Sequence, residues 1–507
     1  MRQGADFPDK GEASTAWSGC WIVLSLLLVF VIGTGLTLKE TPALTYDEGW
    51  TLMVAKNWTE GRGYTQSLLD KPVPAKMLNI GFPAVAPMAL SLLTLGVGIW
   101  QARLPSLLFT VASLGMLCVL TIWLFDRVIA RTALLALFFA SMGFHPFFWG
   151  RLAIGEPAGV CYLLAAFVLF LAGESRSVAF LMLSGGLLAL ACVTKVQFVP
   201  FVSIGLIVPL ALLAYRKSSA QACTLIYWLG SFSLSCALFF LVQRLLVGDE
   251  RLTERGLYTS TAFVPNIDVR LSALYSVVTH GLPTVVALVV ACRSFSSNLT
   301  TRKEIARTAL LAFSLSWVVW YVCSSVGWAR YMYPCIMVGS PFVGKLLHSL
   351  VAHTRLAFAD RRWRTGLLLA SVTAVPLVWS GALTLVGLHD TIKSRDDSLV
   401  EVARFFEHLP KGQVIESFDM QVFFLLQTRQ YHYPPDRVQL LLNRRSFLGE
   451  QVSIDYDPLM ADPDYLVVGP AGRWLKVYDD IRYDPRHFIP VGRAGSYEVY
   501  RRARPAK

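Results

Sequence analysis

Charged residues are scarce in this chain of 507 residues. Asp, Glu, Lys and Arg fill 16% of its positions, whereas about a quarter is usual for soluble proteins. The mean hydropathy is +0.51. Apolar runs recur from Trp21 to Leu388, and many have the roughly 17 to 25 residues needed to cross a hydrocarbon core of about 30 Å. This composition excludes a soluble globular protein and predicts a polytopic membrane protein.

Long apolar runs are absent after Asp390, where charged and aromatic residues mix. This change predicts two regions, a transmembrane bundle over 1–388 and a small α/β domain over 389–507. In the second region, residues 398–409 have the pattern of an amphipathic helix. Strands are expected at 413–416, 465–468 and 497–501, with a turn at 492–495. Tyr431, Tyr433, Trp474 and Tyr478 are expected to pack in the core of this domain rather than stack on a sugar.

Several site types have no signature in the sequence. The eight histidines are scattered without metal-ligand spacing, and no Gly-rich phosphate loop for a nucleotide appears. All nine cysteines lie in or beside apolar runs and none lies in the C-terminal region, so no disulfide framework is implied. The net charge of +12 comes from short basic loops between apolar runs, which indicates membrane orientation rather than nucleic-acid binding.

These basic loops fix the predicted topology. If the N-terminal tail is cytoplasmic, the loops around Arg127, Arg176, Arg216, 293–307 and 345–364 all become cytoplasmic too. The C-terminal domain then lies outside, and the chain is expected in the plasma membrane of a bacterium. About eleven spans are needed, and they are predicted at 19–38, 103–125, 132–149, 158–173, 177–194, 198–215, 222–246, 272–292, 308–326, 332–350 and 365–387.

The first span is interpreted as a retained signal anchor, because no small-residue cleavage site follows it. A long outer loop over 39–102 comes next. Its apolar stretch 82–100 carries Pro83, Pro87 and two glycines, which are poor residues for a helix interior. Counting it as a span would place the basic loops outside. It is therefore predicted to be an interfacial or re-entrant element.

Two adjacent acids, Asp47 and Glu48, lie at the outer end of the first span. Thr45 with Glu48 fits a capping box, and Asp47 suits the positive end of a helix dipole. Neighbours on a helix point about 100° apart. Glu48 is therefore assigned to the cap, and Asp47 to a cavity above it.

The order of several motifs resembles the GT-C glycosyltransferase superfamily, in its protein O-mannosyltransferase and aminoarabinose-transferase branch. An Asp-Glu pair opens the first outer loop, as in that branch. The further matching stretches are 70–72 (DKP), 102–106 (ARLPS), 150–156 (GRLAIGE), 194–195 (TK) and 330–334 (RYMYP). The chain departs from the branch at Glu156, where aspartate is usual, and at Asp70 and Val73, which leaves substrate identity open.

The resemblance implies a GT-C-like bundle that moves a sugar from a polyprenyl-phosphate donor to a lipid, glycan or protein acceptor, with inversion. Such a displacement needs a base, for which Asp47 is the candidate. Glu48 and Glu156 are the two other candidate catalytic residues. Cations are needed for the leaving phosphate, and the donor-binding candidates are Lys71, Lys195, Arg330, Tyr331 and Arg103.

Simpler roles compete for these residues. Arg103 and Lys71 are near apolar runs, where basic side chains often extend to lipid headgroups. Glu156 could pair with Arg151. Lys195 stands between two apolar segments with almost no loop, which favours a cavity position. Three carboxylates without histidine leave a divalent metal open.

Three other functions compete with a transferase that uses a polyprenyl-phosphate sugar. A lipid or sugar transporter is expected to show paired repeats, and none is seen. A non-catalytic assembly protein would tolerate the loss of Asp47. A polymerase that uses a lipid-diphosphate donor would not need the Asp-Glu pair.

Overall fold

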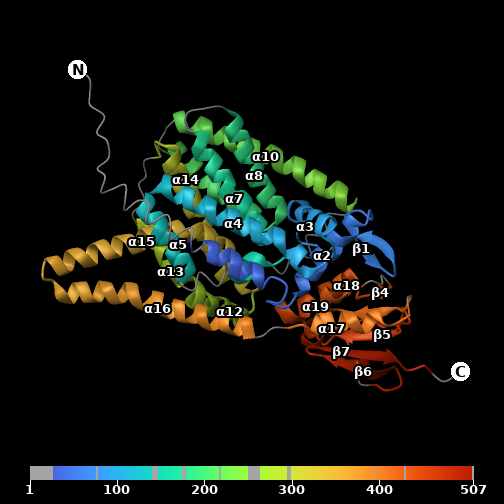
Figure 1. The fold of residues 1–507 in the computed structure, drawn as a ribbon. Coiled ribbons are helices and arrows are strands. Elements are labelled where there is room, and N and C mark those ends of the chain that lie inside the picture. Colours follow the sequence, from blue (N-terminus) through green and yellow to red (C-terminus); the bar gives the residue numbers. More distant parts are fainter. Residues whose placement is uncertain are drawn as a thin grey trace.

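The computed structural model describes residue 25 and residues 27–75, 78–139, 147–173, 178–215, 219–248, 263–293, 299–393, 396–410, 412–426, 430–482 and 484–504. Helices make up most of it, and a small sheet lies at the C-terminal end beside the helices of the first outer loop (Figure 1). The predicted fold class, a mainly helical membrane bundle with a small C-terminal α/β part, is confirmed.

The bundle follows the predicted order of apolar segments. After a helix at Leu27–Leu36, its elements are α4 (Ile99–Leu124), α5 (Arg127–Phe139), α7 (Gly155–Ala172), α8 (Val178–Thr194), α9 (Phe198–Tyr215), α10 (Ser219–Val247), α12 (Ile267–Ser276), the π-helical turn η4 (Val277–Gly281), α13 (Leu282–Arg293), α14 (Arg302–Cys323), α15 (Tyr333–Ala359) and α16 (Trp363–Lys393). Short 3-10 turns, η1 (Trp149–Arg151) and η5 (Ala329–Met332), precede α7 and α15. Helices α15 and α16 form a long antiparallel pair that projects from the bundle (Figure 1).

Within the described ranges, seven helical segments are long and apolar enough to cross a membrane. Three further apolar helices are shorter, among them Val178–Thr194. The chain is thus an integral membrane protein, while the number of about eleven spans stays a prediction. One expected bound is wrong: α4 begins at Ile99, so Arg103 lies inside the helix rather than at its start.

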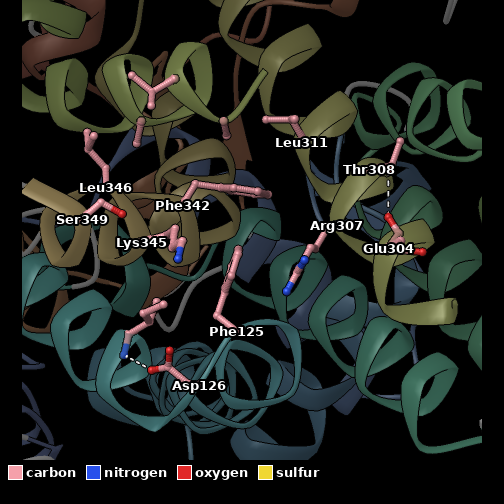
Figure 2. A pocket seen from close by; sticks show the side chains of 14 residues that line it. Phe125, Asp126, Glu304, Arg307, Thr308, Leu311, Phe342, Lys345, Leu346 and Ser349 are labelled. Atoms are coloured by element: carbon pink, nitrogen blue, oxygen red, sulfur yellow. Dashed lines mark hydrogen bonds between the residues drawn. The ribbon is translucent and has the colours of Figure 1, made fainter. Parts of the chain in front are cut away.

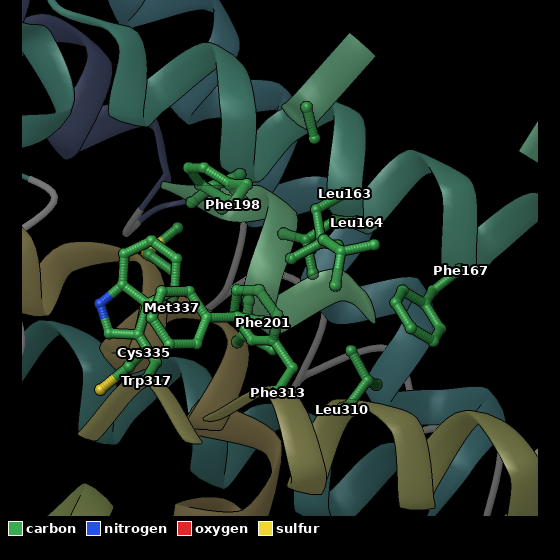
Figure 3. Packing of buried hydrophobic residues seen from close by; sticks show 14 of the residues in the cluster. Leu163, Leu164, Phe167, Phe198, Phe201, Leu310, Phe313, Trp317, Cys335 and Met337 are labelled. Atoms are coloured by element: carbon green, nitrogen blue, oxygen red, sulfur yellow. The ribbon is translucent and has the colours of Figure 1, made fainter. Parts of the chain in front are cut away.

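The bundle packs around aromatic side chains. Phe198 and Phe201 of α9 contact Trp317 of α14, with ring centroids 5.1 and 4.5 Å apart (Figure 3). Gly205 permits this approach, because a Cβ there would lie 3.0 Å from the Ala309 carbonyl oxygen. The indole Nε1 of Trp317 donates to the carbonyl oxygen of Tyr331, at 2.6 Å. The aromatic core therefore holds the turn that precedes α15.

The first outer loop folds into α2 (Tyr46–Thr59), the antiparallel hairpin of β1 (Thr65–Leu68) and β2 (Lys71–Pro74), and α3 (Phe82–Leu95). The hairpin turn has two residues, Leu69 and Asp70, both with positive φ, as a type I′ hairpin turn requires. The 14 residues of α3 span only about 21 Å, too short for a full crossing. This length agrees with an interfacial or re-entrant element at 82–100, which stays a prediction.

The C-terminal region holds a five-stranded sheet in the order β4-β3-β5-β7-β6. Strands β4, β3 and β5 are parallel, and β7 pairs antiparallel with β5 and β6. The elements are α17 (Ser398–Glu407), β3 (Ile415–Ser417), α18 (Gln421–Leu425), β4 (Tyr431–His432), α19 (Asp436–Leu448), β5 (Tyr465–Val468), α20 (Pro470–Trp474), α21 (Asp479–Arg482), β6 (Phe488–Ala494) and β7 (Tyr497–Arg502). Four aromatic residues were expected in the core of this region. The prediction is wrong for Trp474, because its side chain is 60% exposed. The turn expected at 492–495 is shorter, because Gly492 lies in β6.

The carboxyl end of β3 carries a buried acid. The carboxylate of Asp419, just after β3, accepts hydrogen bonds from the backbone N–H groups of Gly469, Ala471 and Gly472 at 2.9 to 3.1 Å. Burial raises the pKa of Asp419, and these three donors act in the opposite direction. The arrangement ties the end of β3 to α20 and orders the edge of the sheet that faces α2.

Helix α2 lies against this edge. Gly49 packs so closely on α18 that a Cβ would lie 2.2 Å from the backbone nitrogen of Gln421. The ring of Tyr46 stacks on Phe418 at 5.0 Å, and Lys56 donates to the carbonyl oxygens of Phe424 and Leu426. The helix that bears the Asp-Glu pair is therefore packed between the bundle and the C-terminal sheet.

Candidate functional site

The site starts at the N-terminus of α2, where both halves of the predicted capping box are present. The backbone N–H of Glu48 donates to the Thr45 hydroxyl, and that of Thr45 donates to the Glu48 carboxylate at 3.0 Å. This cap fixes the direction of the first turn. As predicted, Glu48 points back into the cap and is fully buried, whereas the side chain of Asp47 is 36% exposed.

Glu48 has a second partner that the sequence did not indicate. Arg103 of α4 makes a bidentate ion pair with it, with Nε–Oε1 and Nη2–Oε2 distances of 2.8 Å, and both side chains are fully buried. The other N–H groups of Arg103 donate to the carbonyl oxygens of Leu38, Pro42 and Ala43. All five N–H groups of the guanidinium are thus occupied. This pairing does not fit the predicted role of Arg103 in binding a donor phosphate.

Asp47 has a different partner and forms an ion pair with Arg330 of η5. The guanidinium of Arg330 lies over the Trp328 ring at 4.4 Å and over the Tyr331 ring at 5.1 Å. The two partners are 283 residues apart in the chain. The turn between α14 and α15 therefore brings a cation to the exposed acid of the Asp-Glu pair.

Glu156 and Lys195 form a second ion pair, and both side chains are almost completely buried. Helices α7 and α8 run antiparallel, so the first turn of α7 lies beside the end of α8. The alternative pairing of Glu156 with Arg151 is wrong, because Arg151 donates to the hydroxyls of Thr37 and Thr41. Lys195 Nζ also lies 4.9 Å from the centroid of the Tyr331 ring.

Tyr331 thus joins the two ion pairs, since one cation of each pair contacts its ring. We call these five residues, Asp47, Glu156, Lys195, Arg330 and Tyr331, the acid–base cluster. Two of its atoms, Glu156 Oε2 and Arg330 Nε, are buried without a hydrogen-bond partner among the described residues. Buried polar atoms are normally satisfied, so this pair of atoms marks a place where a polar ligand would be bound.

The backbone around Lys195 is fixed from α3. The N–H of Gly81 donates to the carbonyl oxygen of Thr194 at 2.9 Å. A Cβ at Gly81 would lie 1.9 Å from the carbonyl oxygen of Val193, so no other residue fits without a shift. The first outer loop therefore supports the cluster from two sides, with α2 supplying Asp47 and the start of α3 holding Lys195.

Lys71 lies away from the contacts of the cluster. It is exposed at the start of β2, and the preceding Asp70 pairs with Arg62 at 2.6 Å. In the part of the chain that the structure describes, no contact links Lys71 to the acid–base cluster. The structure therefore brings together five of the eight predicted residues, places Glu48 and Arg103 in a pair beside them, and leaves Lys71 on the hairpin.

The three predicted acids do not form a metal-ligand set. Asp47, Glu48 and Glu156 are each paired with a different cation. Among the described residues, no group of three or more His, Cys, Asp or Glu side chains could hold a metal ion.

Trp328 was not predicted as a site residue. Its ring lies against Arg330, and it contacts Phe447 of α19 at 5.5 Å. An aromatic residue two positions before a motif arginine is a weak signal in sequence, because Trp is common at membrane interfaces.

The fold matches solved structures over nearly the whole chain. ArnT from Cupriavidus metallidurans bound to undecaprenyl phosphate superposes with a TM-score of 0.65 and 15% identity, covering 96% of this chain and 98% of that one. The archaeal oligosaccharyltransferase AglB from Archaeoglobus fulgidus, in complex with an inhibitory peptide and a dolichol-phosphate, matches with a TM-score of 0.54 and 12% identity, covering 96% and 75%. The sequence matches no protein-family model and no curated protein. The chain therefore has a GT-C-type glycosyltransferase fold, and the predicted resemblance is confirmed at the level of structure.

Proposed function

We propose that this protein is a membrane glycosyltransferase that moves a sugar from a polyprenyl-phosphate donor to an acceptor hydroxyl, with inversion. The carrying observation is the acid–base cluster, in which an accessible carboxylate and two cations meet around one tyrosine ring. One structural neighbour is in complex with undecaprenyl phosphate, and another is in complex with a dolichol-phosphate. Both complexes support a lipid-phosphate donor.

Each member of the cluster has a role in this proposal. Asp47 takes the proton of the acceptor hydroxyl as its oxygen attacks the anomeric carbon. The bond from that carbon to the phosphate oxygen breaks, and the polyprenyl phosphate leaves. Arg330 and Lys195 neutralise the charge that the leaving phosphate gains. Glu156 orients Lys195, and Lys71 is a further candidate for the donor.

The ion pair of Asp47 with Arg330 bears on how such a reaction would start. In this pair the two charges neutralise each other. A phosphate that draws Arg330 to itself would release Asp47 to act as a base. Donor binding would thus activate the carboxylate only when a leaving group is in place, which limits side reactions with water.

The predicted orientation belongs to this proposal. The cluster and the C-terminal sheet lie at one end of the bundle, and the basic segments 127–131, 302–307 and 345–364 lie at the other. With the positive-inside rule, the N-terminus is cytoplasmic and the cluster is extracytoplasmic, in the inner membrane of a bacterium.

The decisive test is transfer of radiolabelled sugar from a panel of polyprenyl-phosphate sugars, in membranes that contain the wild type or Asp47→Asn. General base catalysis contributes about 10²- to 10⁴-fold, so we expect Asp47→Asn to lose transfer by a factor in that range. Asp268→Asn, which removes an exposed acid from the first turn of α12, is the matched control and should transfer normally.

Two results would contradict the proposal. Equal transfer by Asp47→Asn and the wild type would show that Asp47 is not the base. Transport of a labelled lipid across the membrane, without formation of a glycosidic product from any donor, would support the transporter instead.

A further inference from the structure

Helix α19 of the C-terminal region contacts the element that carries Asp47. Near the start of α19, Gln439 Oε1 accepts a hydrogen bond from the hydroxyl of Tyr46, at 3.1 Å. Tyr46 is the first residue of α2 and the immediate neighbour of Asp47. The C-terminal region therefore contacts the chain directly beside the candidate base.

The other end of α19 contacts the turn that carries Arg330. The ring of Phe447 lies edge-to-face against the ring of Trp328, with centroids 5.5 Å apart. The Arg330 guanidinium lies over the same Trp328 ring at 4.4 Å. Phe447 is buried in the hydrophobic core of the bundle, and Leu448 packs against that core. The end of α19 is therefore packed into the bundle beside η5.

These contacts form a closed ring through the candidate active site. The ring passes, in order, through Gln439, Tyr46, Asp47, Arg330, Trp328 and Phe447, and it closes along α19. Its two ends on α19 are about 12 Å apart along the axis, at a rise of about 1.5 Å per residue. A helical segment of fixed length thus connects the two elements that hold the ion pair.

Helix α19 is itself fixed to the sheet by a different face. Val438 and Leu442 are buried in the hydrophobic core of the C-terminal region, in one cluster with Leu466 of β5. The side-chain nitrogen of Gln439 donates to the carbonyl oxygen of Pro434 at 2.8 Å, which orients its oxygen toward α2. Because α19 is packed on the sheet, it can hold α2 and η5 at a constant distance from each other.

We infer that Gln439 and Phe447 are positioning residues, which keep the candidate base and the candidate phosphate-binding arginine at a fixed separation during transfer. This inference rests on the proposed function. There, a donor phosphate draws Arg330 away from Asp47, so that the ion pair no longer joins α2 to η5. The contacts of α19 involve neither charge, and they persist when the ion pair opens. Both residues act through the side chains that they contact.

The first test removes the hydrogen bond at the start of α19. Tyr46→Phe and Gln439→Met each eliminate it, and a misplacement of about 1 Å can cost about 10²-fold in rate. We expect each variant to lower kcat for sugar transfer at least about ten-fold, with KM for the donor nearly unchanged. The double variant should be no slower than either single variant, because all three lack the same contact.

Tyr456→Phe is the matched control for this test. Tyr46 and Tyr456 are both half-buried and pack against the same core cluster. The Tyr456 hydroxyl donates to Glu416 within the C-terminal region, at 2.6 Å. Its removal should destabilise the region to a similar extent, and kcat should stay within a few-fold of the wild type.

Hydrogen–deuterium exchange tests the other end of α19 without turnover, because backbone amides exchange through local opening. In Phe447→Leu we expect faster exchange than in the wild type over 324–332, the segment that includes η5 and Trp328. Phe488→Leu, which truncates another buried phenylalanine of the C-terminal region, should leave this segment unchanged. In Tyr46→Phe the first turn of α2 should exchange faster, and in Tyr456→Phe it should not.

Three results would overturn the inference. They are unchanged exchange in both segments, faster exchange with a normal kcat, and an equal fall of kcat in Tyr46→Phe and Tyr456→Phe. The last would reduce the contact to a general contribution to stability. Faster exchange in the two variants, in a wild type that transfers sugar from no donor, would contradict the proposed function but support the positioning of α2 and η5 by α19.

Discussion

At the scale of single residues, two neighbouring acids have opposite environments. Glu48 is buried against Arg103, whereas Asp47 is partly exposed beside Arg330. Removing one partner of a buried ion pair leaves the other charge unpaired, which costs about 3–5 kcal/mol. We therefore expect Glu48→Gln to lower the melting temperature of the detergent-purified protein strongly, and Asp47→Asn to leave it nearly unchanged. An equal effect of both substitutions would contradict this division of roles.

Tyr331 allows a test of what its side chain supplies. Its ring contacts both Lys195 and Arg330, and each such cation–π contact is worth roughly 0.5–2 kcal/mol. We expect Tyr331→Phe to retain transfer within a few-fold and Tyr331→Leu to lose at least ten-fold, because only phenylalanine keeps the ring. Initial rates over a range of donor concentrations measure both. If the Phe variant were as impaired as the Leu variant, the hydroxyl would be the contributing group, as a hydrogen-bond donor to the phosphate.

The sequence identified most members of the acid–base cluster but few of its contacts. The assignment of Glu48 to the cap followed from local spacing, and the structure confirms it. The pair of Glu156 and Lys195 was within reach of sequence reasoning, because two consecutive antiparallel helices place the start of one beside the end of the next. The pair of Asp47 and Arg330 was not, since 283 residues separate them and the packing order of the helices between them has no local signal.

At the scale of elements, the contact of α2 with α18 depends on one glycine. A Cβ at Gly49 would lie 2.2 Å from the backbone nitrogen of Gln421, so Gly49→Ala must push the two helices apart. We expect the free energy of unfolding to fall by about 1–3 kcal/mol, as for other overpacked sites, together with faster proteolysis in the C-terminal region.

Gly230→Ala is the matched control in α10, because a Cβ there meets open space. It should stabilise slightly, by up to about 1 kcal/mol. Equal proteolysis of both variants would show that α2 is not tightly docked.

The bundle was easier to predict than the C-terminal region. Long apolar runs gave helix positions within a few residues, as for 198–215, which forms α9. Strand 465–468 was also correct. Helix α19 was missed because its sequence, DRVQLLLNRRSFL, is strongly polar. Its ends could have revealed it, since Pro434 and Pro435 precede it, Asp436 is its first residue, and Gly449, with a φ of +69°, follows its last residue.

At the scale of the whole molecule, the two ends of the bundle differ in charge and shape. One end carries the acid–base cluster beside the C-terminal sheet. The other end carries the basic segments 127–131, 302–307 and 345–364 and a cavity of about 450 Å³ between α4, α13, α14 and α15 (Figure 2). Such asymmetry is what the positive-inside rule predicts for a protein with a single orientation. A catalytic site on one face also requires that face to meet the acceptor, which makes the orientation part of the functional proposal.

Cysteine labelling can test this orientation directly. Met460 is 76% exposed in the C-terminal region, and Arg361 is exposed in the turn between α15 and α16. In sealed right-side-out vesicles, we expect a membrane-impermeant maleimide to label Met460→Cys above the level of the parent protein. Arg361→Cys should react only after the vesicles are opened, because an intact bilayer separates its turn from the reagent. The reverse pattern would place the acid–base cluster on the cytoplasmic side, and the side from which the donor and the acceptor approach would have to be reassigned. Reaction of both sites in sealed vesicles would mean that an even number of crossings separates them, and the predicted span at 365–387 would be wrong.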